Sequence, residues 1–179
     1  MNINKDYNIL IIDDDSLTRT GLFEVLTTDY NNSKIEDKYE FPYALVGTSG
    51  NSFKFFYCED PEKLESRIRT FLNNHLFFDQ IYFDMKFDNY GDGDQSNIFE
   101  TKGYDLLKNI SKIYRENRAI YDTPKLFIYS ILQPSVDDKI EIKKQLNNYN
   151  IYFIEDKTVE GLLSSVNQHS DKMLEKLLK

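Results

Sequence analysis

Acidic, hydroxyl and amino side chains follow several of the apolar runs in this chain. Residues 13 to 15 are three consecutive aspartates, and Asp84 comes after a later apolar run. Ser130 lies near the end of another apolar run, and Lys157 follows a further one. Close carboxylates repel by about 1 kcal/mol per pair in water and about 4 kcal/mol at an effective dielectric constant near 20. A hard divalent cation relieves that repulsion, and carboxylates with water suit Mg²⁺. Together these residue types suit metal-assisted phosphoryl chemistry, in which a carboxylate attacks while an ammonium and a hydroxyl hold phosphoryl oxygens.

The elements that would bring these residues together are strands alternating with helices. The apolar, β-rich runs are Tyr7–Ile12, Phe53–Cys58, Gln80–Phe83, Lys125–Ile131 and Ile151–Ile154. Helical patterns follow at about residues 17–28, 61–72, 104–114, 136–147 and 159–178. This alternation predicts an α/β fold, a five-stranded doubly wound parallel sheet with helices on both faces. Ligands of such sheets bind outside the carboxyl ends of the strands, where the polar residues above would converge.

Two stretches fit neither pattern. Residues 29 to 51 predict an extended loop after the first helix, with at most a short strand or half a hairpin around Tyr43–Gly47. Phe87–Gly103 is polar and contains glycine, which indicates a long mobile loop after the third strand. Ser16 is predicted to cap the first helix, with Asp15 as a structural residue beside it. Without a repeat or flexible linker, residues 1–179 are predicted to form a single domain.

Composition narrows the classes of function. The net charge of −8 argues against direct nucleic-acid binding. Cys58 is the one cysteine, so no internal disulfide can form, and zinc-like Cys/His spacing and glycine-rich nucleotide motifs are absent from the sequence. No apolar run approaches roughly 18 residues, and the N-terminal run ends in aspartates, unlike a secretory signal. A cytoplasmic protein without membrane association is therefore expected.

The ordered motifs resemble the receiver domain of two-component response regulators over nearly the whole chain. ILIIDDDS resembles the first strand of that family with its acidic pair, here Asp13 and Asp14. IYFDMK resembles the third strand with its phospho-acceptor, here Asp84. GYDLLKNI resembles the helix that follows. KLFIYS places Ser130 at the family's switch hydroxyl, and FIEDK places Lys157 at its lysine position.

The resemblance implies a flavodoxin-like receiver fold and a magnesium-dependent phosphoryl switch rather than an enzyme. It implies that Asp84 accepts the phosphoryl group and that Ser130 and Lys157 then contact it. The residues implied for holding Mg²⁺ are Asp13, Asp14, Asp84 and the backbone carbonyl of Lys86.

The implied partners are proteins. A histidine kinase or phosphotransfer protein would supply the phosphoryl group, and with no effector domain on the chain the output would be contact with a downstream protein. The last helix is predicted to extend beyond what one sheet needs, so its outer end, Met173–Lys179, is a candidate for a homodimer or partner contact.

Two alternatives remain open. Ile131 replaces a small residue of the family, Thr158 replaces its proline, and the loop after Asp84 is longer. These departures favour a degenerate pseudo-receiver that acts as a binding module without phosphorylation. A phosphohydrolase resembling the haloacid-dehalogenase superfamily could use Asp13 and Asp15, but it needs a later acidic motif and leaves Asp84 without a role.

Overall fold

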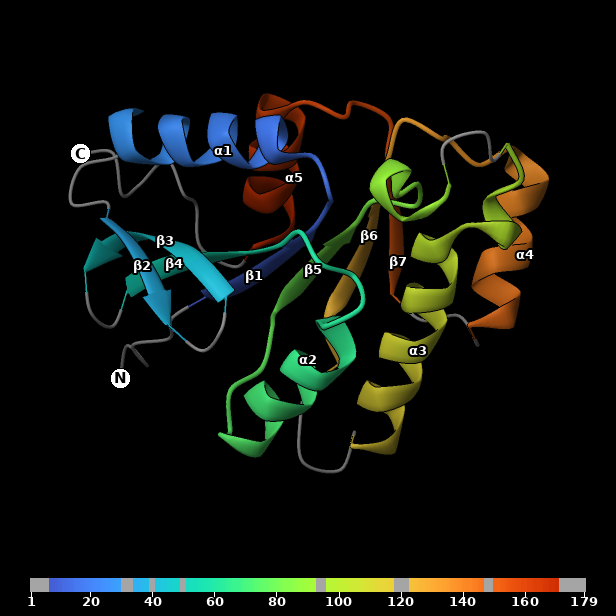
Figure 1. The fold of residues 1–179 in the computed structure, drawn as a ribbon, viewed down its shortest axis with the longest axis horizontal. Helices are drawn as coiled ribbons and strands as arrows, with labels where there is room; N and C mark the ends of the chain where they lie inside the picture. The colour runs from blue at the N-terminus through green and yellow to red at the C-terminus, as the bar shows by residue number, and fades with distance from the viewer. Residues whose placement is uncertain are drawn as a thin grey trace.

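The computed structural model describes residues 7–29, 34–38, 41–48, 51–92, 96–117, 123–146 and 150–170. These residues form a seven-stranded mixed sheet with helices on both faces (Figure 1). The strands are β1 (Tyr7–Ile12), β2 (Lys34–Lys38), β3 (Phe41–Thr48), β4 (Asn51–Cys58), β5 (Gln80–Phe83), β6 (Lys125–Tyr129) and β7 (Ile151–Ile154). The helices are α1 (Ser16–Asp29), α2 (Leu64–Asn73), α3 (Lys102–Glu116), α4 (Val136–Gln145) and α5 (Val159–His169), with short 3₁₀ helices η1 (Asp88–Tyr90) and η2 (Ile98–Glu100).

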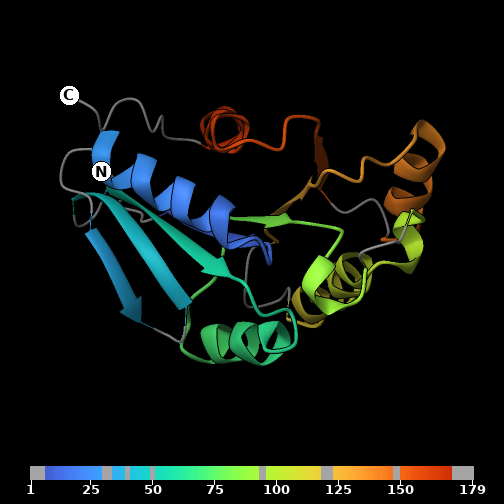
Figure 2. The same cartoon turned by 45° about the horizontal axis from the view of Figure 1, so that its top comes forward.

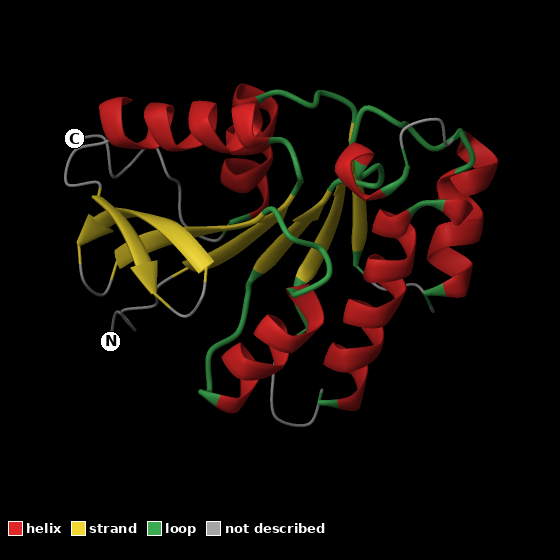
Figure 3. Cartoon of the chain, in the orientation of Figure 1, coloured by secondary structure: helices red, strands yellow, loops and turns green. Residues whose placement is uncertain are grey.

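The strand order across the sheet is β2-β3-β4-β1-β5-β6-β7. The pairs from β4 to β7 are parallel, whereas β2 and β3 pair antiparallel with each other and β3 with β4 (Figure 3). Ile12 pairs with Phe83, and Phe83 pairs with Ile128. This register brings the residues that follow β1, β5 and β6 to one edge of the sheet.

The predicted five-stranded, wholly parallel sheet is therefore wrong in its extent, although its α/β class and its helices on both faces are confirmed. The segment predicted as an extended loop after the first helix supplies β2 and β3. Tyr43, Ala44 and Val46 of β3 are buried, and the Tyr43 ring packs 4.9 Å from that of Phe56 in β4. Burial of apolar side chains against β4 accounts for β3, and β2 pairs with β3 in turn.

Each face of the sheet carries its own apolar core. Ile9 and Ile11 of β1 pack on the face covered by α1 and α5, while Leu10 and Ile12 pack on the face covered by α2, α3 and α4 (Figure 2). All four side chains are fully buried. The continuous apolar run of β1 therefore serves both cores, as expected of a central parallel strand.

Several element boundaries differ from the sequence prediction; β4, for example, begins at Asn51 rather than at Phe53. α2 begins at Leu64 rather than near Pro61, and β6 ends at Tyr129, so that Ser130 lies just past the strand. α5 is described as far as His169, and the predicted contact segment Met173–Lys179 lies outside the described residues. In the described part of the chain, no helix is long and apolar enough to cross a membrane.

Candidate metal centre

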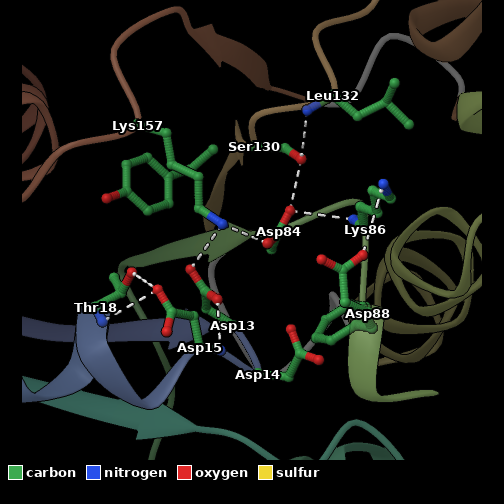
Figure 4. Close-up of polar contacts among 12 residues, drawn as sticks. Asp13, Asp14, Asp15, Thr18, Asp84, Lys86, Asp88, Ser130, Leu132 and Lys157 are labelled. Carbon is green, nitrogen blue, oxygen red and sulfur yellow. Dashed lines mark hydrogen bonds and ion pairs between the residues drawn. The ribbon is translucent and has the colours of Figure 1, made fainter. Parts of the chain in front are cut away.

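Asp84 lies at the centre of a polar cluster at the carboxyl edge of the parallel strands (Figure 4). The Ser130 hydroxyl donates a hydrogen bond to Asp84 Oδ1 at 2.5 Å, and the backbone N–H of Lys86 donates to the same oxygen at 3.1 Å. The Lys157 ammonium lies 2.5 Å from Asp84 Oδ2. Asp84 and Ser130 are buried, so this network is formed largely out of contact with water.

Asp13 is the most deeply buried carboxylate of the cluster, with no exposed surface. Its Oδ1 accepts a hydrogen bond from the backbone N–H of Asp15 at 2.9 Å. Its Oδ2 lies 3.1 Å from Nζ of Lys157, yet no group in the described residues hydrogen-bonds to this oxygen. Burial raises the pKa of Asp13 to about 6, with Lys157 opposing the shift and Asp84 adding to it.

Asp14 is half-buried and turns toward the loop after β5. Its Oδ2 accepts a hydrogen bond from the backbone N–H of Asn89 at 2.8 Å, and its carbonyl accepts from Asn89 Nδ2 at 3.3 Å. Burial raises the pKa of Asp14, the Asn89 N–H opposes the shift, and the charge of Asp84 adds to it.

The three carboxylates form a group that fits a divalent cation. One oxygen from each of Asp13, Asp14 and Asp84 lies within 4.8 Å of the others. Asp13 Oδ2 is a buried carboxylate oxygen paired with the Lys157 ammonium at 3.1 Å but outside hydrogen-bond geometry, so it keeps lone pairs that a metal ion could use. An all-oxygen donor set suits Mg²⁺.

Lys157 supplies the positive charge that bridges two of these carboxylates. Burial lowers its pKa, but the charges of Asp84 and Asp13 outweigh this, so that the pKa is raised overall. Its Nζ also lies 5.9 Å from the centroid of the Tyr129 ring. The Tyr129 hydroxyl donates to the Thr158 carbonyl at 3.0 Å, which ties the residue after Lys157 to β6. Lys157 therefore stays protonated and fixed at the cluster.

Thr158, which replaces a proline of the receiver pattern, is the N-cap of α5. Its hydroxyl accepts a hydrogen bond from the Gly161 N–H at 3.0 Å. A Cβ at Gly161 would lie 2.4 Å from the Asp156 carbonyl oxygen, so the short connection from β7 to α5 requires glycine there. This tight connection holds Lys157 over the cluster.

Asp15 and Lys86 have roles beside the cluster. The Asp15 carboxylate accepts hydrogen bonds from the N–H groups of Leu17 and Thr18, at 2.9 and 3.3 Å, so Asp15 caps α1 and the predicted capping role of Ser16 is wrong. The Lys86 ammonium lies 3.6 Å from Asp88 Oδ1, directed toward the loop. A metal bond from the Lys86 carbonyl stays a prediction.

The loop after Asp84 contains residues that the sequence analysis missed. Asn89 contacts Asp14, and Asp92 Oδ2 accepts the N–H groups of Phe87 and Lys102, at 3.0 and 2.9 Å. Phe87 is fully buried. Residues 87–92 thus form a hydrogen-bonded turn with a buried aromatic ring, and the mobility of the loop stays a prediction; residues 93–95 lie outside the described part. The alternation of aspartate and glycine in this segment was the one feature of the sequence that could have indicated an ordered turn near the acidic cluster.

Comparisons with known proteins do not assign the chain to a family. No family model and no curated protein matches it. It is similar to the crystal structure of a protein assigned as nucleolar GTP-binding protein 1 from Plasmodium falciparum, with 14% identity over 99% of this chain and 88% of that chain. The TM-score of 0.46 is too low to carry any property of that protein to this one.

These findings correct the resemblance to a two-component receiver. No family model matches the chain, a receiver model included. The motifs behind the resemblance are short, and carboxylates at strand ends occur in many α/β proteins of unrelated function. The response-regulator function, with phosphorylation of Asp84 by a histidine kinase, is therefore withdrawn, as are the pseudo-receiver and phosphohydrolase alternatives.

Proposed function

We propose that this protein binds Mg²⁺ through Asp13, Asp14 and Asp84, and binds a phosphate-bearing ligand beside the metal through Lys157 and Ser130. The proposal concerns binding, and turnover of the ligand is not part of it. The observation that carries it is the arrangement around Lys157, whose ammonium lies 3.1 Å from Asp13 and 2.5 Å from Asp84.

The charges in the cluster support a divalent cation. Three carboxylates and one ammonium leave two negative charges uncompensated when all four groups are ionised. Such charges are costly where water is excluded, and the raised pKa values of Asp13 and Asp14 are the consequence. One Mg²⁺ would neutralise the cluster and would attract a phosphoryl oxygen to the site.

The donors around Asp84 support a phosphate group as the second ligand. Lys157 and Ser130 both contact Asp84, one from the β7–α5 connection and one from the end of β6. An ammonium and a hydroxyl are donors that bind phosphate oxygens well, especially where the surroundings are dry. Once Mg²⁺ neutralises Asp84, both donors become available to an incoming anion.

The topology supports a ligand at this place. The parallel strands have the order β4-β1-β5-β6-β7. The chain therefore runs from β1 to β4 on one side and then crosses to β5, β6 and β7 on the other side of β1. We infer that this part of the sheet is doubly wound in the flavodoxin-like manner, with the switch point between β1 and β5. Ligands of open α/β sheets bind at such points, and Asp13, Asp14 and Asp84 follow these two strands.

The test is thermal unfolding with Mg²⁺ or with chelator. Mg²⁺ at about 100 times its Kd should stabilise the wild type by about 2.7 kcal/mol, which raises Tm by roughly 5 to 10 °C for a chain of this size. Asp14→Asn should abolish that rise and should raise Tm in chelator, because it removes one of the crowded charges. Asp15→Asn is the matched control, since it removes a neighbouring charge and keeps a good helix cap; it should retain the Mg²⁺ response.

Inorganic phosphate tests the second ligand. Calorimetry should detect phosphate binding in Mg²⁺ and much weaker binding in chelator, while Lys157→Met should lose it in both. Equal phosphate binding with and without Mg²⁺, or full binding by Lys157→Met, would rule out the proposed arrangement. A wild type whose Tm does not respond to Mg²⁺ would rule out the metal site itself.

A further inference from the structure

We infer that the turn after β5 positions Asp14 for metal binding, and that Asn89 is its positioning residue. This turn, residues 87–92, is called the β5 turn below. Asn89 contacts Asp14 twice, through its backbone N–H to Oδ2 at 2.8 Å and through its side-chain Nδ2 to the carbonyl at 3.3 Å. The inference rests on the proposed metal site and adds to it a residue that binds no metal itself.

Asp14 differs from the other two carboxylates in how it is held. Asp13 and Asp84 are buried, and both pair with Lys157. Asp14 is half-buried, and no ion pair of Asp14 is found in the described residues. A partly exposed aspartate side chain adopts several rotamers unless a neighbour selects one. The hydrogen bond from the Asn89 N–H to Oδ2 selects one rotamer, and the bond from Asn89 Nδ2 holds the Asp14 backbone. Both lower the ordering cost that metal binding would otherwise include.

The β5 turn is anchored well enough to do this. Phe87 is fully buried in the core beneath α2, α3 and α4. The Asp92 carboxylate joins the start of the turn to the start of α3 through the N–H groups of Phe87 and Lys102. Gly91, with φ of 100°, ends η1 in a backbone conformation that favours glycine. Asn89 therefore lies on a turn that is hydrogen-bonded to the start of α3 and packed into the core through Phe87.

Two variants of Asn89 separate the contributions of its side chain and backbone. Asn89→Ala removes the donor to the Asp14 carbonyl and keeps the N–H to Oδ2. Asn89→Pro removes both donors. Asn97→Ala is the matched control, because Asn97 caps η2 in the same loop and its side chain hydrogen-bonds to Phe99 and Glu100 rather than to the acidic cluster.

The measurement is the Kd for Mg²⁺ by calorimetry, together with Tm in chelator. The Kd should rise about threefold for Asn89→Ala, which loses one hydrogen bond. It should rise about tenfold for Asn89→Pro, the lower end of the range for residues that orient metal ligands. Asn97→Ala should keep the wild-type Kd. Tm of Asn89→Ala in chelator should stay within about 2 °C of the wild type, which separates positioning of Asp14 from general support of the fold.

The outcomes distinguish this inference from the proposed function. If the wild type binds Mg²⁺ and Asn89→Ala binds it equally well, Asn89 does not position Asp14. The same conclusion follows if Asn97→Ala weakens binding as much as Asn89→Ala. If the wild type does not bind Mg²⁺, the metal site is wrong and the role of Asn89 is wrong with it. If Asn89→Pro does not fold, the Kd of Asn89→Ala for Mg²⁺ is sufficient to test the inference.

Discussion

At the scale of single residues, the cluster combines ionic groups from three segments with the Ser130 hydroxyl from a fourth. Lys157 and Ser130 contact the Asp84 carboxylate from the side of β6 and β7, while Asp13 and Asp14 face it from β1. Without a cation, burial of these carboxylates is unfavourable, and Lys157 offsets only part of the cost. The fold therefore retains unfavourable electrostatic repulsion between carboxylates at the place where a ligand is proposed to bind.

Asp13 should make the metal-free protein less stable as the pH rises. Its pKa is about 6 in the folded state and 3.8 in the unfolded reference, so the folded state binds the proton more tightly. Its contribution to the free energy of unfolding therefore falls as the pH rises from about 4 to above 6. In chelator, Asp13→Asn should raise the free energy of unfolding by about 1 to 3 kcal/mol at pH 7.5, from the size of the shift.

Urea unfolding of the wild type and Asp13→Asn between pH 4.5 and 7.5 measures this difference in the free energy of unfolding. The stabilisation by Asp13→Asn should decrease toward pH 4.5. Asp15→Asn provides a contrast in sign. The hydrogen bond from the Thr18 hydroxyl lowers the pKa of Asp15 below its usual 3.8, so its ionised form contributes stability that is lost only below about pH 4. The effect of Asp15→Asn on the free energy of unfolding should therefore stay constant between pH 4.5 and 7.5. If the stabilisation by Asp13→Asn does not depend on pH, burial of the ionised Asp13 carboxylate is not what destabilises the metal-free protein.

The residue types of the cluster could be predicted from the sequence, since each follows a strand that was predicted nearly at its true end. Asp13, Asp84, Ser130 and Lys157 meet as expected. Asn89 could not be predicted, because it contacts Asp14 partly through its backbone N–H, which every residue except proline carries. Tyr129, beside Lys157, was equally hidden within an apolar strand.

At the scale of elements, the start of α3 determines where Asp84 lies. A Cβ at Gly103 would come 2.3 Å from the Asp84 carbonyl oxygen and 2.4 Å from Cα of Met85, which are both backbone atoms. The Gly103 N–H donates to the Met85 carbonyl at 3.2 Å. Only glycine permits the helix to approach the end of β5 this closely.

Gly103→Ala should therefore shift the end of β5 and weaken the metal site. We expect a loss of roughly 1 to 3 kcal/mol in the free energy of unfolding, as for other overpacked sites, together with weaker Mg²⁺ binding. Gly21→Ala is the matched control. Its Cβ would lie 3.7 Å from Val159 Cγ2, an ordinary contact, and alanine should stabilise α1 by up to about 1 kcal/mol. Urea unfolding of both variants measures the two changes in the free energy of unfolding. Equal changes for Gly103→Ala and Gly21→Ala would contradict the role of Gly103.

At the scale of the whole molecule, the parallel part of the sheet was accessible from the sequence. Of its antiparallel extension, only a short strand or half a hairpin around Tyr43–Gly47, within β3, was predicted. Continuous apolar runs indicated strands buried on both faces, which β1 and β5 confirm. The sequence of β2, KIEDK, is mostly charged and resembles a loop. Its strand conformation depends on pairing with β3, and such dependence on distant partners is typical of β-structure.

The additional strands cover the edge of β4 and lie away from the acidic cluster. β2 and β3 lie beyond β4, while the residues of the cluster follow β1, β5, β6 and β7 (Figure 1). An exposed edge strand invites pairing with other chains, and the antiparallel pair protects β4 from it. The site and the extension are therefore separate features of one sheet.

The central claim is that Asp13, Asp14 and Asp84 hold a divalent cation. The most direct test is the structure of crystals grown with Mn²⁺, because the anomalous scattering of Mn²⁺ locates the metal. The account predicts an anomalous peak bonded to oxygens of all three carboxylates, with Asn89 still in contact with Asp14. The peak should be absent from Asp14→Asn crystals. A wild-type structure with Lys157 still joined to Asp13 and Asp84, and with no peak at the cluster, would contradict the claim.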